Sequence, residues 1–142
     1  MTVLLAILLS AGVGAIAAIH ALWGLGSHWP EASEEALARS VVGDGRRRMP
    51  AAWLCFAVAL VLAIIALWPL YAVTLASQTV ALQGSFTIAG IFIARGLAGY
   101  SRRWREHFTD EPFVTRNRRY YSPLCLLLGV AYIALVSGEF GT

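Results

Sequence analysis

Long apolar runs alternate with short polar segments along the whole chain. A helix needs about 20 apolar residues to cross a bilayer, and four segments reach or approach that length. Backbone groups inside a membrane must bond within their own segment, so these segments are expected to be helices. The sequence therefore predicts an all-α fold, a four-transmembrane-helix bundle that forms a single integral membrane domain over residues 1–142. The expected spans are residues 3–25, 50–73, 78–100 and 120–137.

Positive charge is gathered in two of the connecting loops. All 11 basic residues are arginines, and ten of them lie in the loops 27–49 and 101–119. The loop near residues 72–78 and both ends of the chain carry no basic residue. Because cytoplasmic loops are enriched in basic residues, we expect two Arg-rich cytoplasmic loops, with both termini outside.

Composition agrees with this interpretation. Hydrophobic residues make up 58% of the chain and charged residues 13%, whereas a soluble domain has about 25% charged residues. The net charge of +3 is confined to loops beside apolar spans. Such clusters favour contact with membrane lipids, including anionic headgroups, and do not indicate nucleic-acid binding.

Two local patterns predict further structure. Pro30 suits the start of a short interfacial helix in the first loop, and Gly43 suits its end. Gly90, Ala94 and Ala98 recur at four-residue spacing in the third span, which favours close helix packing along that stripe.

His20 is the only ionisable side chain in the first span, and Trp23 shares its helical face. Intramembrane ionisable groups usually face the bundle and raise a functional question. One hypothesis makes His20 a haem or metal ligand or a proton-transfer group. The other is a neutral histidine that is hydrogen-bonded to its surroundings, since no second intramembrane histidine is present for bis-histidine ligation of haem.

Arg95 is the only charged residue inside a predicted span. It either binds an anionic headgroup, carboxylate or phosphate, or extends to the cytoplasmic interface. Cys55 and Cys125 lie at similar predicted depth; a thiolate–imidazole metal site and two small core residues are the alternatives. Tyr121 and Ser122 open the last span and have either a capping or a hydroxyl role.

No acidic residue lies inside any predicted span. This argues against proton-coupled transport by intramembrane carboxylates. We predict no metal site and no cofactor, and an enzyme is the less favoured class.

Three sequence segments carry a resemblance to a known family. They are His20-Ala-Leu-Trp23-Gly24-Leu-Gly26 followed by Trp29-Pro30, then Arg95-Gly96-Leu-Ala-Gly99-Tyr100, and then Arg119-Tyr-Tyr121-Ser122-Pro123-Leu124-Cys125. With these HxxWxxG and YSPLC motifs the chain resembles an uncharacterised family of bacterial four-helix integral membrane proteins, a domain of unknown function. Members often carry an acidic residue just before the last motif, where this chain has Asn117.

The resulting hypothesis is a small binding or accessory membrane protein. A polar pocket at its cytoplasmic end would be lined by His20, Trp23, Arg95, Tyr121 and Cys125. The ligand would be a lipid headgroup or a small anion; a membrane-protein partner or a homo-oligomer is also open. The alternatives are a membrane-embedded enzyme or haem or metal protein that uses His20, and an oligomeric transporter of small anions.

Overall fold

The computed structural model describes the backbone of residues 2–140 and the side chains of residues 2–138, and within these residues every regular element is helical. The expected location of the two chain ends concerns residues 1, 141 and 142, which lie outside the described residues. The long helices are α1 (Thr2–Gly24), α3 (Ala52–Thr74), α4 (Gln78–Ala98) and α7 (Ser122–Phe140). The short ones are α2 (Glu34–Val41), α5 (Arg102–His107), α6 (Phe113–Arg116) and a π-helical turn, η1 (Asn117–Tyr121).

Four helices are long and apolar enough to cross a membrane, as the hydrophobic pattern predicted. The first three have nearly the expected bounds. The fourth differs, because α6 and η1 continue into α7 and the apolar helix extends from Phe113 to Gly138. Arginines that were expected in a loop, such as Arg118, therefore lie on helical turns.

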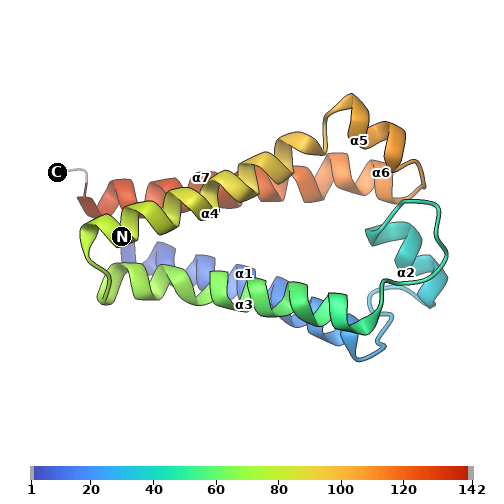
Figure 1. Cartoon of the computed structure of the whole chain (residues 1–142), viewed down its shortest axis with the longest axis horizontal. Helices are drawn as coiled ribbons and strands as arrows, with labels where there is room; N and C mark the ends of the chain where they lie inside the picture. The colour runs from blue at the N-terminus through green and yellow to red at the C-terminus, as the bar shows by residue number, and fades with distance from the viewer. Residues whose placement is uncertain (1, 141–142) are drawn as a thin grey trace.

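The long helices form two antiparallel pairs, α1 with α3 and α4 with α7 (Figure 1). The pairs lie close together at the end that holds the α3–α4 connection and the first and last described turns. They lie farther apart at the opposite end, called here the loop end, which holds α2, α5 and α6. Both arginine-rich segments are thus at one end of the molecule.

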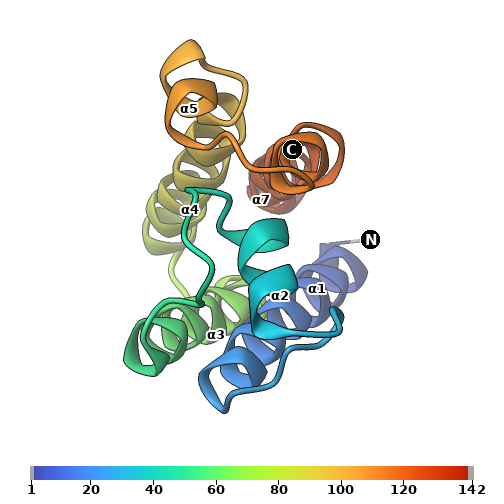
Figure 2. The same ribbon diagram turned by 90° about the vertical axis from the view of Figure 1, so that its right-hand side faces the viewer.

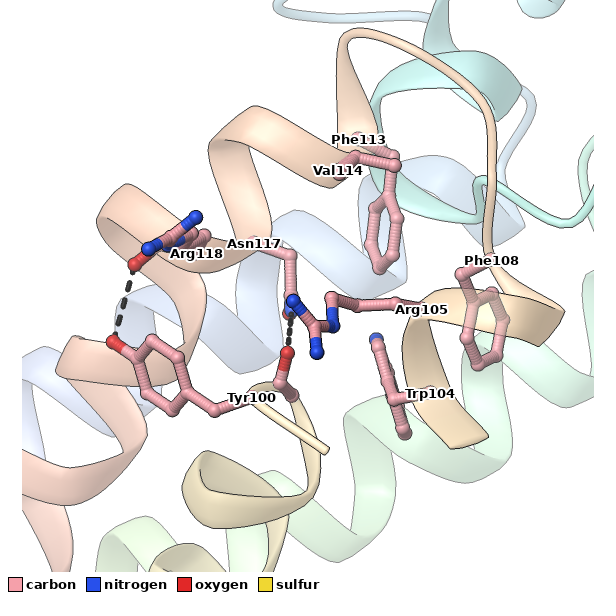
Figure 3. A pocket seen from close by; sticks show the side chains of 9 residues that line it. Tyr100, Trp104, Arg105, Phe108, Phe113, Val114, Asn117 and Arg118 are labelled. Carbon is pink, nitrogen blue, oxygen red and sulfur yellow. Dashed lines mark hydrogen bonds between the residues drawn. The ribbon is translucent and has the colours of Figure 1, made fainter. Parts of the chain in front are cut away.

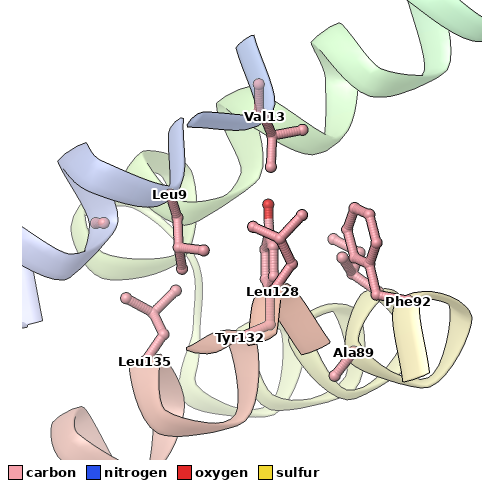
Figure 4. Packing of buried hydrophobic residues seen from close by; sticks show 10 residues of the cluster. Leu9, Val13, Ala89, Phe92, Leu128, Tyr132 and Leu135 are labelled. Atoms are coloured by element: carbon pink, nitrogen blue, oxygen red, sulfur yellow. The ribbon is translucent and has the colours of Figure 1, made fainter. Parts of the chain in front are cut away.

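One apolar cluster joins the two pairs. Leu9 and Val13 of α1 meet Phe92 of α4 and Tyr132 and Leu135 of α7 (Figure 4). Tyr132 is fully buried, and its ring stacks on Phe92 with 6.0 Å between centroids. Most of the remaining large apolar side chains of these helices are exposed, as is usual for surfaces that face lipid.

A proline in α3 explains a hydrogen bond at the centre of this cluster. Pro69 lies inside the helix and has no N–H, so the carbonyl of Ile65, four residues earlier, loses its helical donor. The hydroxyl of Tyr132 donates to that carbonyl at 2.8 Å. The bond satisfies a backbone acceptor that α3 cannot satisfy itself, and it connects α3 with α7.

Helix α2 lies between the two pairs at the loop end (Figure 2). The hydroxyl of Ser33 caps it by accepting from the N–H of Ala36 at 3.2 Å, so the helix begins at Glu34 and not at Pro30. Leu37 and Ala38 are fully buried, so the apolar face of this helix packs inside the protein. Gly43 follows the helix with φ +72°, and a side chain there would overlap the ring of Phe113.

The expected stripe of small residues is not the packing surface of α4. Gly90 and Ala94 are exposed, and a Cβ on Gly90 would meet no atom within 4 Å. The close approach to α7 lies on another face. A Cβ on Gly96 would come 3.0 Å from the Ser122 carbonyl oxygen, and one on Gly129 would come 3.0 Å from that of Ala89.

Removal of the Tyr132 hydroxyl tests the proline interpretation. Tyr132→Phe leaves the Ile65 carbonyl without a donor, and we expect the free energy of unfolding to fall by about 1–3 kcal/mol. In the Pro69→Ala background the helix supplies an N–H, so the same substitution should cost less than about 1 kcal/mol. Unfolding in mixed micelles of the four members of this double-mutant cycle gives the coupling. Equal costs in both backgrounds would contradict the interpretation.

Candidate functional site

The five residues expected to line one pocket lie in three places at the loop end. His20 and Trp23 lie on α1, and Tyr121 contacts α2 from the fourth helix. Arg95 of α4 and Cys125 of α7 lie near one another in the other helix pair. They share a depth in the bundle, but they belong to different helix pairs.

His20 is satisfied within its own helix. Its Nδ1 donates to the carbonyl of Ile16 at 2.9 Å, and its ring lies 4.8 Å from that of Trp23. Both residues line a mostly apolar cavity of about 170 Å³ with Met49, Leu54 and Cys55. Among the described residues, no group of three or more His, Cys, Asp or Glu side chains is placed to hold a metal ion.

Tyr121 connects the two arginine-rich segments. Its hydroxyl donates to the backbone carbonyl of Ser40 in α2 at 3.1 Å. Arg116, one turn earlier, forms an ion pair with Glu31 in the first loop. The contacts hold α2 against the start of the fourth helix, which gives Tyr121 a structural role.

Arg95 is partly buried, and its charge has no carboxylate partner among the described residues. Its Nη2 donates to Oδ1 of Asn117 at 3.0 Å. Its Nη1 is enclosed and makes no hydrogen bond to a described residue. Asn117 is 2% exposed and neutral, so it holds the guanidinium without cancelling its charge.

The guanidinium carbon of Arg95 lies 4.3 Å from the ring centroid of Trp104 in α5. This is the geometry of a cation–π contact. Trp104 is the first of a row of aromatic rings that continues through Phe108 and Phe113 to Tyr121, with neighbouring centroids 4.4, 5.6 and 6.0 Å apart. The Nε1 of Trp104 is buried and has no acceptor among the described residues.

The π-helical turn places Asn117 and Ser122 on one face. In an α-helix two residues five positions apart point about 140° away from each other. Here the N–H of Ser122 bonds to the carbonyl of Asn117, five residues earlier, so the two lie nearly one above the other. A Cβ on Gly99 would overlap Ser122 Oγ and lie 2.8 Å from Asn117 Nδ2. Gly99 thus lets both polar side chains pack against the end of α4.

A cavity of about 120 Å³ opens beside this group (Figure 3). Trp104 and Asn117 line it, together with Arg105 and Arg118. Arg95 does not line it, but contacts both Trp104 and Asn117, which do. N–H donors and positive charge around a small cavity suit an anionic group.

Sequence reasoning identified Arg95 and Cys125 but not most of this group. In the sequence, Trp104 resembles any aromatic residue at a membrane interface. Arg105 and Arg118 are among the loop arginines that indicate which side of the membrane a loop lies on. Asn117 was noticed only because it stands where members of the resembled family often carry an acidic residue. Because the π turn has no simple sequence signature, nothing in the residue spacing pairs Asn117 with Ser122.

Comparison with known proteins gives a family without an assigned activity. No curated protein and no solved structure matches the chain. One family model, described as "Protein of unknown function (DUF3995)", matches residues 13–132. This range contains all three sequence segments on which the resemblance to an uncharacterised family rests. The chain therefore belongs to the DUF3995 family of proteins of unknown function.

Proposed function

We propose that this protein is a membrane-embedded binding protein that holds an anionic group at the loop end of the α4–α7 pair. The observation that carries the proposal is the partly buried guanidinium of Arg95, whose Nη1 is enclosed and whose only hydrogen-bond partner among the described residues is the neutral Asn117. A buried charge is costly unless it is paired and hydrogen-bonded. An anion near Trp104 and Asn117 would balance that charge.

Two polar groups near Arg95 and Asn117 also lack hydrogen-bond partners among the described residues. Trp104 Nε1 is a donor without an acceptor, and Ser122 Oγ is buried without a partner among the described residues. Buried polar groups in proteins are nearly always hydrogen-bonded, and each exception needs an explanation. A bound acceptor near Arg95 and Asn117 would account for this donor and this hydroxyl together.

The proposed location is the inner membrane of a bacterium, with the loop end in the cytoplasm and the opposite end outside. The support is the gathering of ten arginines in the two loops, which the fold brings to one end. In this orientation the site lies at the cytoplasmic interface, where anionic lipid headgroups are available.

Asn117→Asp tests whether the positive charge of Arg95 is needed for anion binding. The change keeps the shape but puts a carboxylate at hydrogen-bond distance from Arg95, so we expect at least a tenfold loss of anion affinity. Chloride, acetate, sulfate and inorganic phosphate would each be added to the protein in neutral detergent, and the shift in unfolding temperature would be measured.

Arg103→Gln is the matched control, because it removes one unit of charge from an exposed side chain of α5 outside the cavity. It should leave the anion response nearly unchanged. An anion response that is equal in Asn117→Asp and the original protein would rule out a role for the Arg95 charge.

The orientation is tested by labelling single cysteines. In a Cys55→Ala, Cys125→Ala background, a cysteine at Ser77 in the α3–α4 connection should react with an impermeant maleimide from outside intact cells. A cysteine at Thr109 at the loop end should react only after the cells are opened. The reverse pattern would overturn the proposed topology.

A further inference from the structure

Two arginines outside the sequence-predicted site face the same cavity. Arg105 is in the last turn of α5, and Arg118 is in the π-helical turn. Both residues are exposed, and both line the cavity with Trp104 and Asn117 (Figure 3). The fold thus brings two arginines that are 13 positions apart in the sequence to the rim of one cavity.

Neither of these charges has an acidic partner. Arg46, Arg47, Arg102 and Arg116 form ion pairs with acidic residues. Within the described residues, Arg105 and Arg118 form none. Arg95 adds a third unbalanced charge behind the Trp104 ring. Two arginines of the cavity lining, and Arg95 behind it, thus have no acidic partner among the described residues.

The size of the cavity limits the ligand. Its volume of about 120 Å³ is slightly smaller than the roughly 150 Å³ of an apolar cavity that holds benzene. A compact anionic group fits inside, and the remainder of a larger ligand would lie outside the cavity. Phe108 and Phe113 supply apolar walls and no negative charge.

We infer that the anion is a phosphate group, held at this cavity by the side chains of Arg105 and Arg118. Guanidinium groups match phosphate oxygens in geometry and charge, and a phosphate carries up to two negative charges. The inference rests on the proposed anion-binding function and names the class of anion. A free phosphate and the phosphate of a lipid headgroup have the same recognition chemistry, so the source is left to the experiment.

The test uses the full chain in neutral detergent and two matched pairs of probes. Inorganic phosphate is compared with acetate, and short-chain phosphatidic acid with the diacylglycerol that has the same chains. Binding is measured by titration calorimetry and by native mass spectrometry. Arg105→Gln and Arg118→Gln should each weaken binding of the phosphate-bearing probe about tenfold, and Arg103→Gln serves as the control.

Each outcome has a definite meaning. Binding of phosphate and phosphatidic acid, at least tenfold tighter than their matched probes and weakened by both variants, supports the inference. Binding of phosphatidic acid alone also supports it and identifies a lipid as the source. Acetate binding equal to phosphate binding overturns the inference but leaves the proposed anion function standing. Phosphate binding that neither variant weakens also overturns it, and no anion binding at all overturns both.

Discussion

The hydroxyl of Tyr132 and the carbonyl of Ile65 meet where the two helix pairs come together. Pro69 frees that carbonyl from the α3 ladder, and a side chain from the other pair takes the place of the missing N–H. The bond is directional, so it restricts how α7 can rotate against α3. Packing of apolar side chains alone would restrict this rotation less. With the pairs fixed here, their separation at the loop end is set, and α2 occupies the space between them.

The placement of α2 links the two arginine-rich segments. The backbone carbonyl of Ser40 accepts a hydrogen bond from the hydroxyl of Tyr121. Glu31 forms an ion pair with Arg116, and the absence of a side chain at Gly43 leaves room for the ring of Phe113. These contacts hold the start of the fourth helix, where Asn117 and Arg118 lie. The proposed anion site therefore depends on a loop that contributes no residue to it.

The number of long helices and the bounds of the first three could be predicted because hydrophobicity over some twenty residues is a strong and local signal. Depth along a span could be predicted too, and His20 and Arg95 do lie toward one end. The direction in which these side chains point around their helix axes could not be predicted. Which faces meet is decided by contacts such as Tyr132 with Ile65, between residues 67 positions apart. The same limit explains why Gly90 and Ala94 face outward and why Leu37 packs inside the protein.

The π-helical turn contains one residue more than an α-helix would need to close the same bond. The alignment of Asn117 with Ser122 therefore depends on the number of residues between them more than on their identity. Deleting a single residue there would restore an ordinary helix and rotate everything before it by about 100° relative to α7, which would take Asn117 and Arg118 away from the cavity. A substitution within the turn changes one contact, while a change in its length would remove the whole proposed site and leave the four spans intact. The length of this turn thus matters to the proposed site as much as the residues in it.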